Sequence, residues 1–166
     1  PNYTDSDFTE DFTNLQDVSN NLAWYLLKKY ESYLRGEDAF ARENYPIAGR
    51  NVLQVEHILP QNPTKWNLSK AQIKPYVNTI GNLTLIHPDM NGRMGNKTLE
   101  DKIPVLEESD IKLNEDILNC IEYRREEIEI ESDTEEEDAD LNPQEVEVPF
   151  WNDETIGRRT SNLCEK

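Results

Sequence analysis

Two short strand-like stretches, each followed by a proline, most constrain what this chain can fold into. Asn51 to Ile58 alternates apolar and polar residues with the period of two that is typical of a β-strand. Pro60 marks its end, because proline removes a donor from the ladder. Thr79 to Ile86 is a second such stretch, and Pro88 then opens a helix. The chain is therefore expected to form two strands and a helix in this region.

The two strand patterns also make local predictions. Strict alternation sends Glu56 and His57 to opposite faces of the first strand, unless the backbone kinks there. Gly81 lies inside the second stretch, where a glycine indicates a bulge or a close approach of another backbone.

Helical spacing dominates elsewhere. Apolar residues recur at helical intervals from Leu15 to Leu34, and Gly36 follows as a stop signal. A second strong helix begins at about Asn114 and is expected to dissolve into the acidic run Glu131 to Asp140. The fold class is therefore predicted to be α+β and mainly helical, with a two-stranded hairpin plus helix embedded in a helical domain. Four aromatic residues of the first helix pack in the core or offer a base-stacking platform: Trp24, Tyr25, Tyr30 and Tyr33.

We expect four parts along the chain. An N-terminal helical support covers residues 1–50, a core of two strands and a helix covers 51–103, and a packing helix covers 104–128. Residues 129–166 form an acidic linker and a C-terminal tail segment. The tail regains apolar residues after the acidic run, and the sequence leaves open whether it docks on the domain or faces a partner.

The charge distribution bears on the kind of partner. The net charge of −17, read globally, argues against nucleic-acid binding. However, residues 104–166 hold 21 acidic and 6 basic groups, whereas residues 51–103 hold 4 acidic and 6 basic groups. The acidity belongs mostly to the C-terminal third, so the strand region is compatible with binding a polyanion.

Membrane and secretory classes are not favoured. No run approaches 18 apolar residues, and the first residues lack the basic-then-apolar pattern of a secretory signal. The two cysteines, Cys120 and Cys164, are too few and too scattered for a disulfide framework. We expect a cytoplasmic protein with no membrane segment.

Glu56, His57 and Asn91 are of residue types that are suited to phosphodiester hydrolysis. This reaction requires a base that deprotonates water, and a neutral histidine is suited to that step. A hard divalent cation can offset the phosphate charge, and carboxylate and amide oxygens are its preferred ligands. Two such ligands leave positions for water and phosphate, as magnesium usually requires, whereas zinc sites favour cysteine and histidine sets that this region lacks.

The combined motifs resemble the ββα-metal core of HNH endonucleases. VEHILPQ at residues 55–61 and GNLTLIHPDMNGRMGNK at 81–97 match a pattern in which an acid–His pair ends the first strand, one Asn follows on the second strand and another lies on the helix. Together with YLLKKYESYL at 25–34, these motifs are most similar to those of the C-terminal nuclease domain of GmrSD-type and SspE-type restriction enzymes. Those are bacterial anti-phage proteins that act on modified DNA or in response to a DNA modification. The resemblance covers residues 12–105.

The resemblance implies a role for each matching residue. His57 would be the general base, and Glu56 and Asn91 would hold Mg²⁺, for which Mn²⁺ would substitute. Asn82 would tie down the loop after the first strand and so fix the base. The DNA-binding residues would be Arg93, Asn96, Lys97 and Lys102.

Structural alternatives stand beside these roles. His57 could be a hydrogen-bonded structural residue, and Asn82 a polar strand or turn residue. His87 is interpreted as a surface or hydrogen-bonding residue, with a second ligand role left open. Arg158 and Arg159 could contact DNA or form solvated salt bridges.

The predicted function is a metal-dependent DNA endonuclease domain of a bacterial anti-phage restriction system, acting on modified or phage double-stranded DNA by nicking or double-strand cleavage. Related enzymes carry an N-terminal sensor or nucleotidase module, and no Gly-rich phosphate loop occurs here, so an excised C-terminal fragment is expected. The alternatives are a catalytically silent DNA-binding or regulatory module, whose acidic block mimics DNA, and an RNA-directed nuclease. The prediction requires His57 and Asn91 to meet around one cation.

Overall fold

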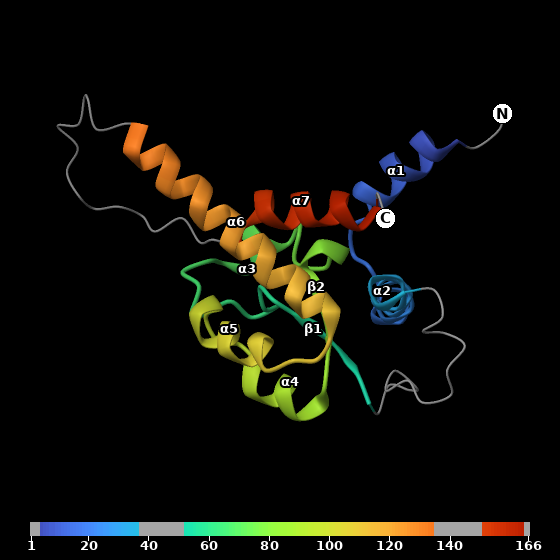
Figure 1. The fold of residues 1–166 in the computed structure, drawn as a ribbon, viewed down its shortest axis with the longest axis horizontal. Helices are drawn as coiled ribbons and strands as arrows, with labels where there is room; N and C mark the ends of the chain where they lie inside the picture. Colours follow the sequence, from blue (N-terminus) through green and yellow to red (C-terminus); the bar gives the residue numbers. More distant parts are fainter. Residues whose placement is uncertain (1–3, 37–51, 135–150, 165–166) are drawn as a thin grey trace.

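The structure, a computed structural model, describes residues 4–36, 52–134 and 151–164, with the backbone alone for 127–134. Figure 1 shows helices arranged around one small hairpin, so the prediction of an α+β, mainly helical fold is confirmed. The elements are α1 (Asp5–Thr13), α2 (Asn20–Arg35), β1 (Gln54–His57), α3 (Lys70–Ile73), the 3₁₀ turn η2 (Ile80–Asn82), β2 (Leu83–Ile86), α4 (Pro88–Met94), α5 (Leu99–Glu107), α6 (Lys112–Thr134) and α7 (Asp153–Cys164).

The hairpin is antiparallel and shorter than the two predicted strands. Gln54 lies opposite Ile86 and His57 opposite Leu83. Asn82 lies in η2, immediately before β2, whereas the sequence pattern placed it within a strand. The period of two gives Gln54 and Glu56 one face of β1 and leaves Val55 and His57 on the other.

Two hydrophobic clusters cover the two faces of the hairpin. One cluster joins the end of β1 to the helices α4, α5, α6 and α7 through residues such as Ile58, Leu59, Ile86, Leu106 and Ile117. The other joins β2 to α2 and the start of α6 through residues such as Leu27, Leu53, Leu83, Leu85 and Leu113. The hairpin is therefore held between two packed layers, which fixes the orientation of its polar residues.

Helix ends follow the capping signals in the sequence. Ser19 accepts a hydrogen bond from the amide of Leu22 and so caps α2, later than the apolar pattern from Leu15 indicates. Gly36 ends α2 with a φ of 99°, a conformation that favours glycine. Pro88 occupies the first turn of α4, and Thr98 caps α5.

The start of α6 is capped from another helix. The carboxylate of Glu31 in α2 is fully buried and accepts hydrogen bonds from the backbone amides of Lys112 and Leu113, at 3.0 and 2.9 Å. Carboxylates are favourable there because the first amides of a helix lack internal partners. The helix then extends to Thr134, past the residue where the acidic run was expected to end it. The rest of that run, from residue 135, lies outside the described residues.

The C-terminal helix α7 docks on the domain. Trp151, Ile156 and Leu163 are buried, and Figure 1 shows α7 running from beside α6 towards α1, close to the hairpin. The guanidinium of Arg159 is also buried and donates to the carbonyls of Gly81 and Leu83, both at 2.8 Å. The docking alternative for the tail therefore holds, and Arg159 neither contacts solvent nor is available to DNA.

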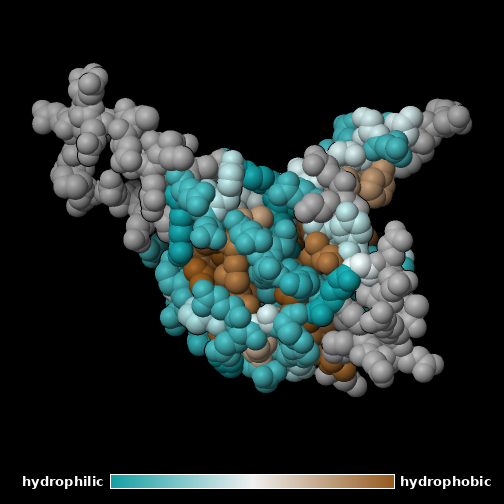
Figure 2. Space-filling model, viewed as in Figure 1, coloured by the Kyte–Doolittle hydropathy of each residue, from teal (hydrophilic) through white to brown (hydrophobic). Residues whose placement is uncertain are grey.

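The visible surface is mostly polar. Figure 2 shows hydrophilic residues over most of the described part of one face, with hydrophobic side chains showing near its centre. Among the described helices, none has the length and apolar composition needed to cross a membrane.

Candidate active site

Glu56 and Lys102 form a buried ion pair at the end of β1. The Nζ atom of Lys102 lies 2.9 Å from Oε1 of Glu56 and donates to the carbonyl oxygen of His57 at 2.6 Å. The lysine side chain is fully buried, and the glutamate side chain is 12% exposed. One ammonium therefore fastens both the side chain of the acid and the backbone of the next residue.

Burial and pairing act in opposite directions on these two groups. Burial raises the pKa of Glu56, and the attraction of Lys102 opposes that rise. Burial likewise lowers the pKa of Lys102, and the Glu56 carboxylate opposes that fall. The pair is best described as an ammonium and a carboxylate, because each charge lies within hydrogen-bonding distance of the other.

His57 is held on the other face of β1 by the side chain of Asn78, and the amide of Gln61 lies beside it. Its Nε2 atom lies 3.0 Å from Oδ1 of Asn78 and 3.3 Å from Nε2 of Gln61. Asn78 is itself held, because its amide nitrogen donates to Asp17 at 3.3 Å. The imidazole is thus restrained by residues 4 and 21 positions along the chain.

These partners bear on the protonation state of His57. Burial lowers its pKa, the hydrogen bond with Asn78 raises it, and the nearby Lys102 charge lowers it further. The net fall in pKa favours the neutral ring near pH 7. Because the Asn78 oxygen can only accept, Nε2 carries the proton in this arrangement. Gln61 then donates to the same Asn78 oxygen and not to the ring, and Nδ1 keeps the lone pair that a general base needs.

Asn82 fastens the chain just after His57. Its side-chain oxygen accepts from the amide of Leu59 at 2.8 Å, and its nitrogen donates to the carbonyl of Leu59 at 2.9 Å and to that of Val77 at 2.8 Å. The oxygen also accepts from Nε1 of Trp151 at 2.9 Å. Asn82 is fully buried, and these hydrogen bonds satisfy both polar atoms of its amide, as burial requires.

Asn91 lies on α4 and faces the Glu56 side of β1. Its nitrogen donates to Oε1 of Gln54 at 2.8 Å, and Gln54 shares a strand face with Glu56. The oxygen donors on this side are therefore one carboxylate and two side-chain amides, a hard set that fits Mg²⁺ or Mn²⁺ with water completing the shell. Within the described residues, no three His, Cys, Asp or Glu side chains gather as a metal group, which is unlike a typical structural zinc site.

Glu56 and His57 face opposite sides, as the alternation predicts. The imidazole points to Asn78, whereas the amide of Asn91 points to Gln54, so the two side chains are not in contact. The structure therefore does not bring His57 and Asn91 together, although the prediction requires them to meet.

The four residues predicted to contact DNA differ in their surroundings. Asn96 and Lys97 are exposed in the turn between α4 and α5. Arg93 is also exposed but forms a two-point ion pair with Glu108, at 2.6 and 2.8 Å. Lys102 is buried against Glu56, so its amine is not exposed as the expected phosphate contact requires.

Some partners of the site carried no signal that pattern reading used. Gln61 and Asn78, which contact the imidazole, lie just after the first strand pattern and just before the second. Trp151, which contacts Asn82, is 69 positions away along the chain. Because Gln61 belongs to the VEHILPQ motif, its position near His57 was the easiest of these to predict from the sequence. His87 is hydrogen-bonded to the carbonyl of Val52 at 3.1 Å, in keeping with its hydrogen-bonding interpretation.

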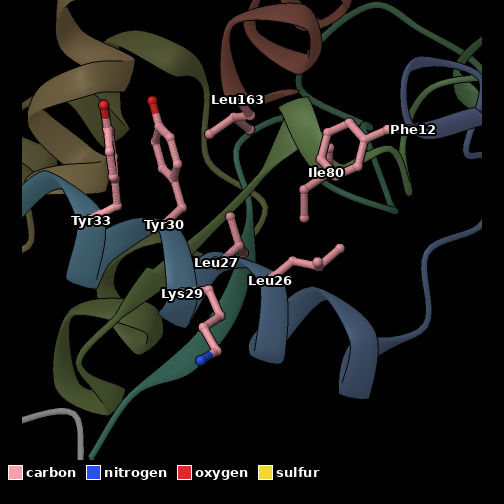
Figure 3. A pocket seen from close by; sticks show the side chains of 8 residues that line it. All are labelled: Phe12, Leu26, Leu27, Lys29, Tyr30, Tyr33, Ile80 and Leu163. Carbon is pink, nitrogen blue, oxygen red and sulfur yellow. The ribbon is translucent and has the colours of Figure 1, made fainter. Parts of the chain in front are cut away.

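A cavity lies away from these residues. It measures about 220 Å³ and opens between α1, α2, η2 and α7. Figure 3 shows its mainly apolar lining, in which Tyr30 and Tyr33 stand side by side on α2 and Leu163 approaches from α7. The lining contains neither Glu56 nor His57, so this cavity is not the candidate active site.

Comparison with known proteins gives a family for the chain. No match is found among curated proteins or among solved structures. Residues 3–166 match the family described as GmrSD restriction endonucleases, C-terminal domain. This range includes the hairpin, the candidate active site and the docked helix α7. The chain therefore belongs to the family of C-terminal domains of GmrSD restriction endonucleases.

Proposed function

We propose that this domain is an HNH-type, Mg²⁺-dependent endonuclease that hydrolyses phosphodiester bonds of double-stranded DNA. His57 acts as the general base, Glu56 and Asn91 are the protein ligands of the cation, and Asn82 positions the base through the turn after β1. Double-stranded DNA that is modified or of phage origin is the proposed substrate. Membership in a family of restriction endonucleases supports DNA as the nucleic acid.

The arrangement at the end of β1 is the observation that carries this proposal. An acid and a histidine are the last two residues of β1, the paired strand begins beside Asn82, and the following helix carries Asn91. Asn82 binds both backbone polar groups of Leu59, two residues after the histidine. A general base must be held within hydrogen-bonding reach of its water, and these contacts restrict its motion.

The residues of the chain divide the reaction between them. Nδ1 of His57 accepts the proton of the attacking water, while Asn78 keeps the ring oriented through Nε2. When bound, the cation polarises the scissile phosphate and stabilises the leaving oxygen. Lys102 keeps Glu56 in place through Oε1, so that the carboxylate would be oriented towards the cation.

A pair of histidine variants tests the proposal. His57→Ala should lower the rate of plasmid cleavage in Mg²⁺ by about 10²–10⁴-fold, because general bases contribute on that order. His87→Ala is the matched control, since His87 contacts Val52 and Asp110 away from Glu56, and cleavage should persist there. Cleavage should stop with EDTA and return with Mn²⁺. Wild-type cleavage by His57→Ala would refute the role of His57.

A catalytically silent DNA-binding or regulatory module is the competing function. It is favoured by the net charge of −17 and by the Lys102 ammonium, which already neutralises the Glu56 carboxylate. The two functions differ in one measurement. If wild-type protein binds DNA but leaves plasmid uncut in both Mg²⁺ and Mn²⁺, the silent module is correct. Cleavage of RNA in preference to DNA would instead support an RNA-directed nuclease.

A further inference from the structure

The chain from Gln61 to Asn78 leaves the candidate active site and returns to it. Both end residues lie against Nε2 of His57, at 3.3 and 3.0 Å, and Gln61 also donates to Asn78 at 3.1 Å. We call residues 61–78 the lysine segment. Both ends of this segment are therefore fixed beside the imidazole.

The lysine segment has an unusual charge for this molecule. It contains Lys65, Lys70 and Lys74 and no acidic residue, and no acid occurs anywhere from residue 57 to residue 88. The protein as a whole carries a net charge of −17. A local excess of three positive charges therefore lies in the segment whose two ends meet at His57, whereas the rest of the chain would repel an anion.

The three lysines project into solvent. Lys65, Lys70 and Lys74 are exposed, and no ion pair joins them to other described residues. Lys70 and Lys74 are four residues apart at the two ends of α3, so they lie on the same side of that turn. They differ in this from Lys102, whose amine is used inside the protein.

The segment is also fixed to the turn that carries Lys97. Trp66 is 8% exposed, and its Nε1 donates to the carbonyl of Lys97 at 2.9 Å. This bond holds the turn that carries Lys97 against the residue that follows Lys65, and both lysines are exposed. The basic surface thus continues from the lysine segment to the turn between α4 and α5.

We propose that the lysine segment, together with Lys97, is the surface that binds the phosphate backbone of duplex DNA and presents one phosphate to the end of β1. Exposed lysines bind phosphates as point charges without reading base sequence. The surface therefore supplies affinity and register, and it explains how a strongly acidic protein holds a polyanion. This inference rests on the proposed function for its choice of DNA.

A charge-matched pair of triple variants tests the surface. Both are made in the full chain with His57→Ala, so that binding is measured without cleavage and without metal. One variant carries Lys65→Gln, Lys70→Gln and Lys74→Gln. The control carries Lys28→Gln, Lys29→Gln and Lys112→Gln, which change the net charge equally on α2 and α6. The probe is a fluorescent DNA duplex titrated at several salt concentrations.

The expected result follows from counterion release. Loss of three phosphate contacts should weaken binding tenfold or more at low salt and reduce the slope of log K against log salt by about 2.7. The control should retain the affinity and slope of the His57→Ala parent. Equal behaviour of the two triple variants, or no DNA binding by the parent, overturns the proposal. Tighter binding of the same duplex made of RNA overturns DNA as the partner.

Cleavage separates this inference from the proposed function. With His57 intact, the lysine-segment variant should cut plasmid with a raised KM and a kcat near that of wild type, because the chemical groups are unchanged. If the lysine-segment variant has the KM of wild type, the proposed DNA-binding surface is wrong, but the nuclease assignment is unaffected. Conversely, if His57→Ala cuts plasmid at the wild-type rate, the nuclease assignment is wrong, but the binding result is unaffected.

Discussion

Single buried side chains hold the candidate active site together. Lys102 bonds Glu56 and the backbone of His57, and Asn82 bonds the backbone of Leu59. Both are fully buried and polar, which is costly unless every polar atom is paired. The residues around His57 are therefore fixed by hydrogen bonds with little freedom to be rearranged.

Trp151 is the residue whose effect on the site is easiest to isolate. Its ring fills the core, and its Nε1 donates to the oxygen of Asn82 that also receives the Leu59 amide. Trp151→Phe keeps an aromatic ring but removes this donor. We expect a lower kcat with little change in KM for DNA, together with a loss of stability of about 1–3 kcal/mol from the lost bond and the smaller ring. Steady-state cleavage kinetics and urea denaturation measure the two effects.

Trp66→Phe is the matched control for Trp151. Trp66 is another buried indole with one hydrogen bond to a backbone carbonyl, but its partner is Lys97. This variant should lose comparable stability while its kcat stays near that of wild type. A kcat that falls equally in both variants would mean that general destabilisation, and not the position of Asn82, explains the effect of Trp151→Phe.

At the scale of elements, the turn η2 and the helix α7 form one unit. Arg159 binds the carbonyls of Gly81 and Leu83 on one side and the carboxylate of Asp116 in α6 on the other. A Cβ atom at Gly81 would lie 2.1 Å from the carbonyl oxygen of Ile156. Glycine is needed here because two backbones approach closely, as the glycine inside the second strand pattern indicated.

Gly81→Ala should therefore separate α7 from η2. The contact is with backbone and cannot be relieved by a rotamer change, so we expect a loss of stability of at least about 1–3 kcal/mol. Gly157→Ala on α7 is the control, because nothing lies within 4 Å of its Cβ position and alanine favours helix by about 1 kcal/mol. Thermal unfolding should show a lower Tm for the first variant and an equal or higher Tm for the second. Equal Tm values for Gly81→Ala and wild type would contradict this packing.

At the scale of the whole molecule, the C-terminal region contributes to the core as well as to the charge. Residues 104–166 hold 21 of the 34 acidic groups, and the same region supplies the buried face of α7. A deletion that tests whether the acidic block mimics DNA would therefore also remove Trp151 from Asn82 and Arg159 from η2 if it extended to the C-terminus.

A chain ended at Thr134 should accordingly be severely destabilised. Three large buried side chains, Trp151, Ile156 and Leu163, would be lost, and each contributes about 1.5–3 kcal/mol by burial. Their sum is comparable with the total stability of about 5–15 kcal/mol of a typical domain. Circular dichroism should show a much lower Tm or no cooperative transition. A truncated chain that melts like the full one would mean that α7 adds little to the fold.

The sequence by itself determined the local features of this protein. The strand-like patterns and prolines located the hairpin, Pro88 marked the start of α4, and the period of two set Glu56 and His57 on opposite faces. These features depend on residues that are close in the chain, so their signals can be found in short windows. The matching motifs then gave the family, which residues 3–166 confirm.

The tertiary structure decided which distant groups meet. The burial of Lys102 against Glu56, the docking of Trp151 on Asn82 and the return of Asn78 to His57 join residues 46, 69 and 21 positions apart. No periodic pattern specifies such contacts, because they arise when packed layers bring separate segments together. A lysine reads the same in sequence whether its amine meets solvent or a carboxylate, and only the packing of α5 against β1 distinguishes the two.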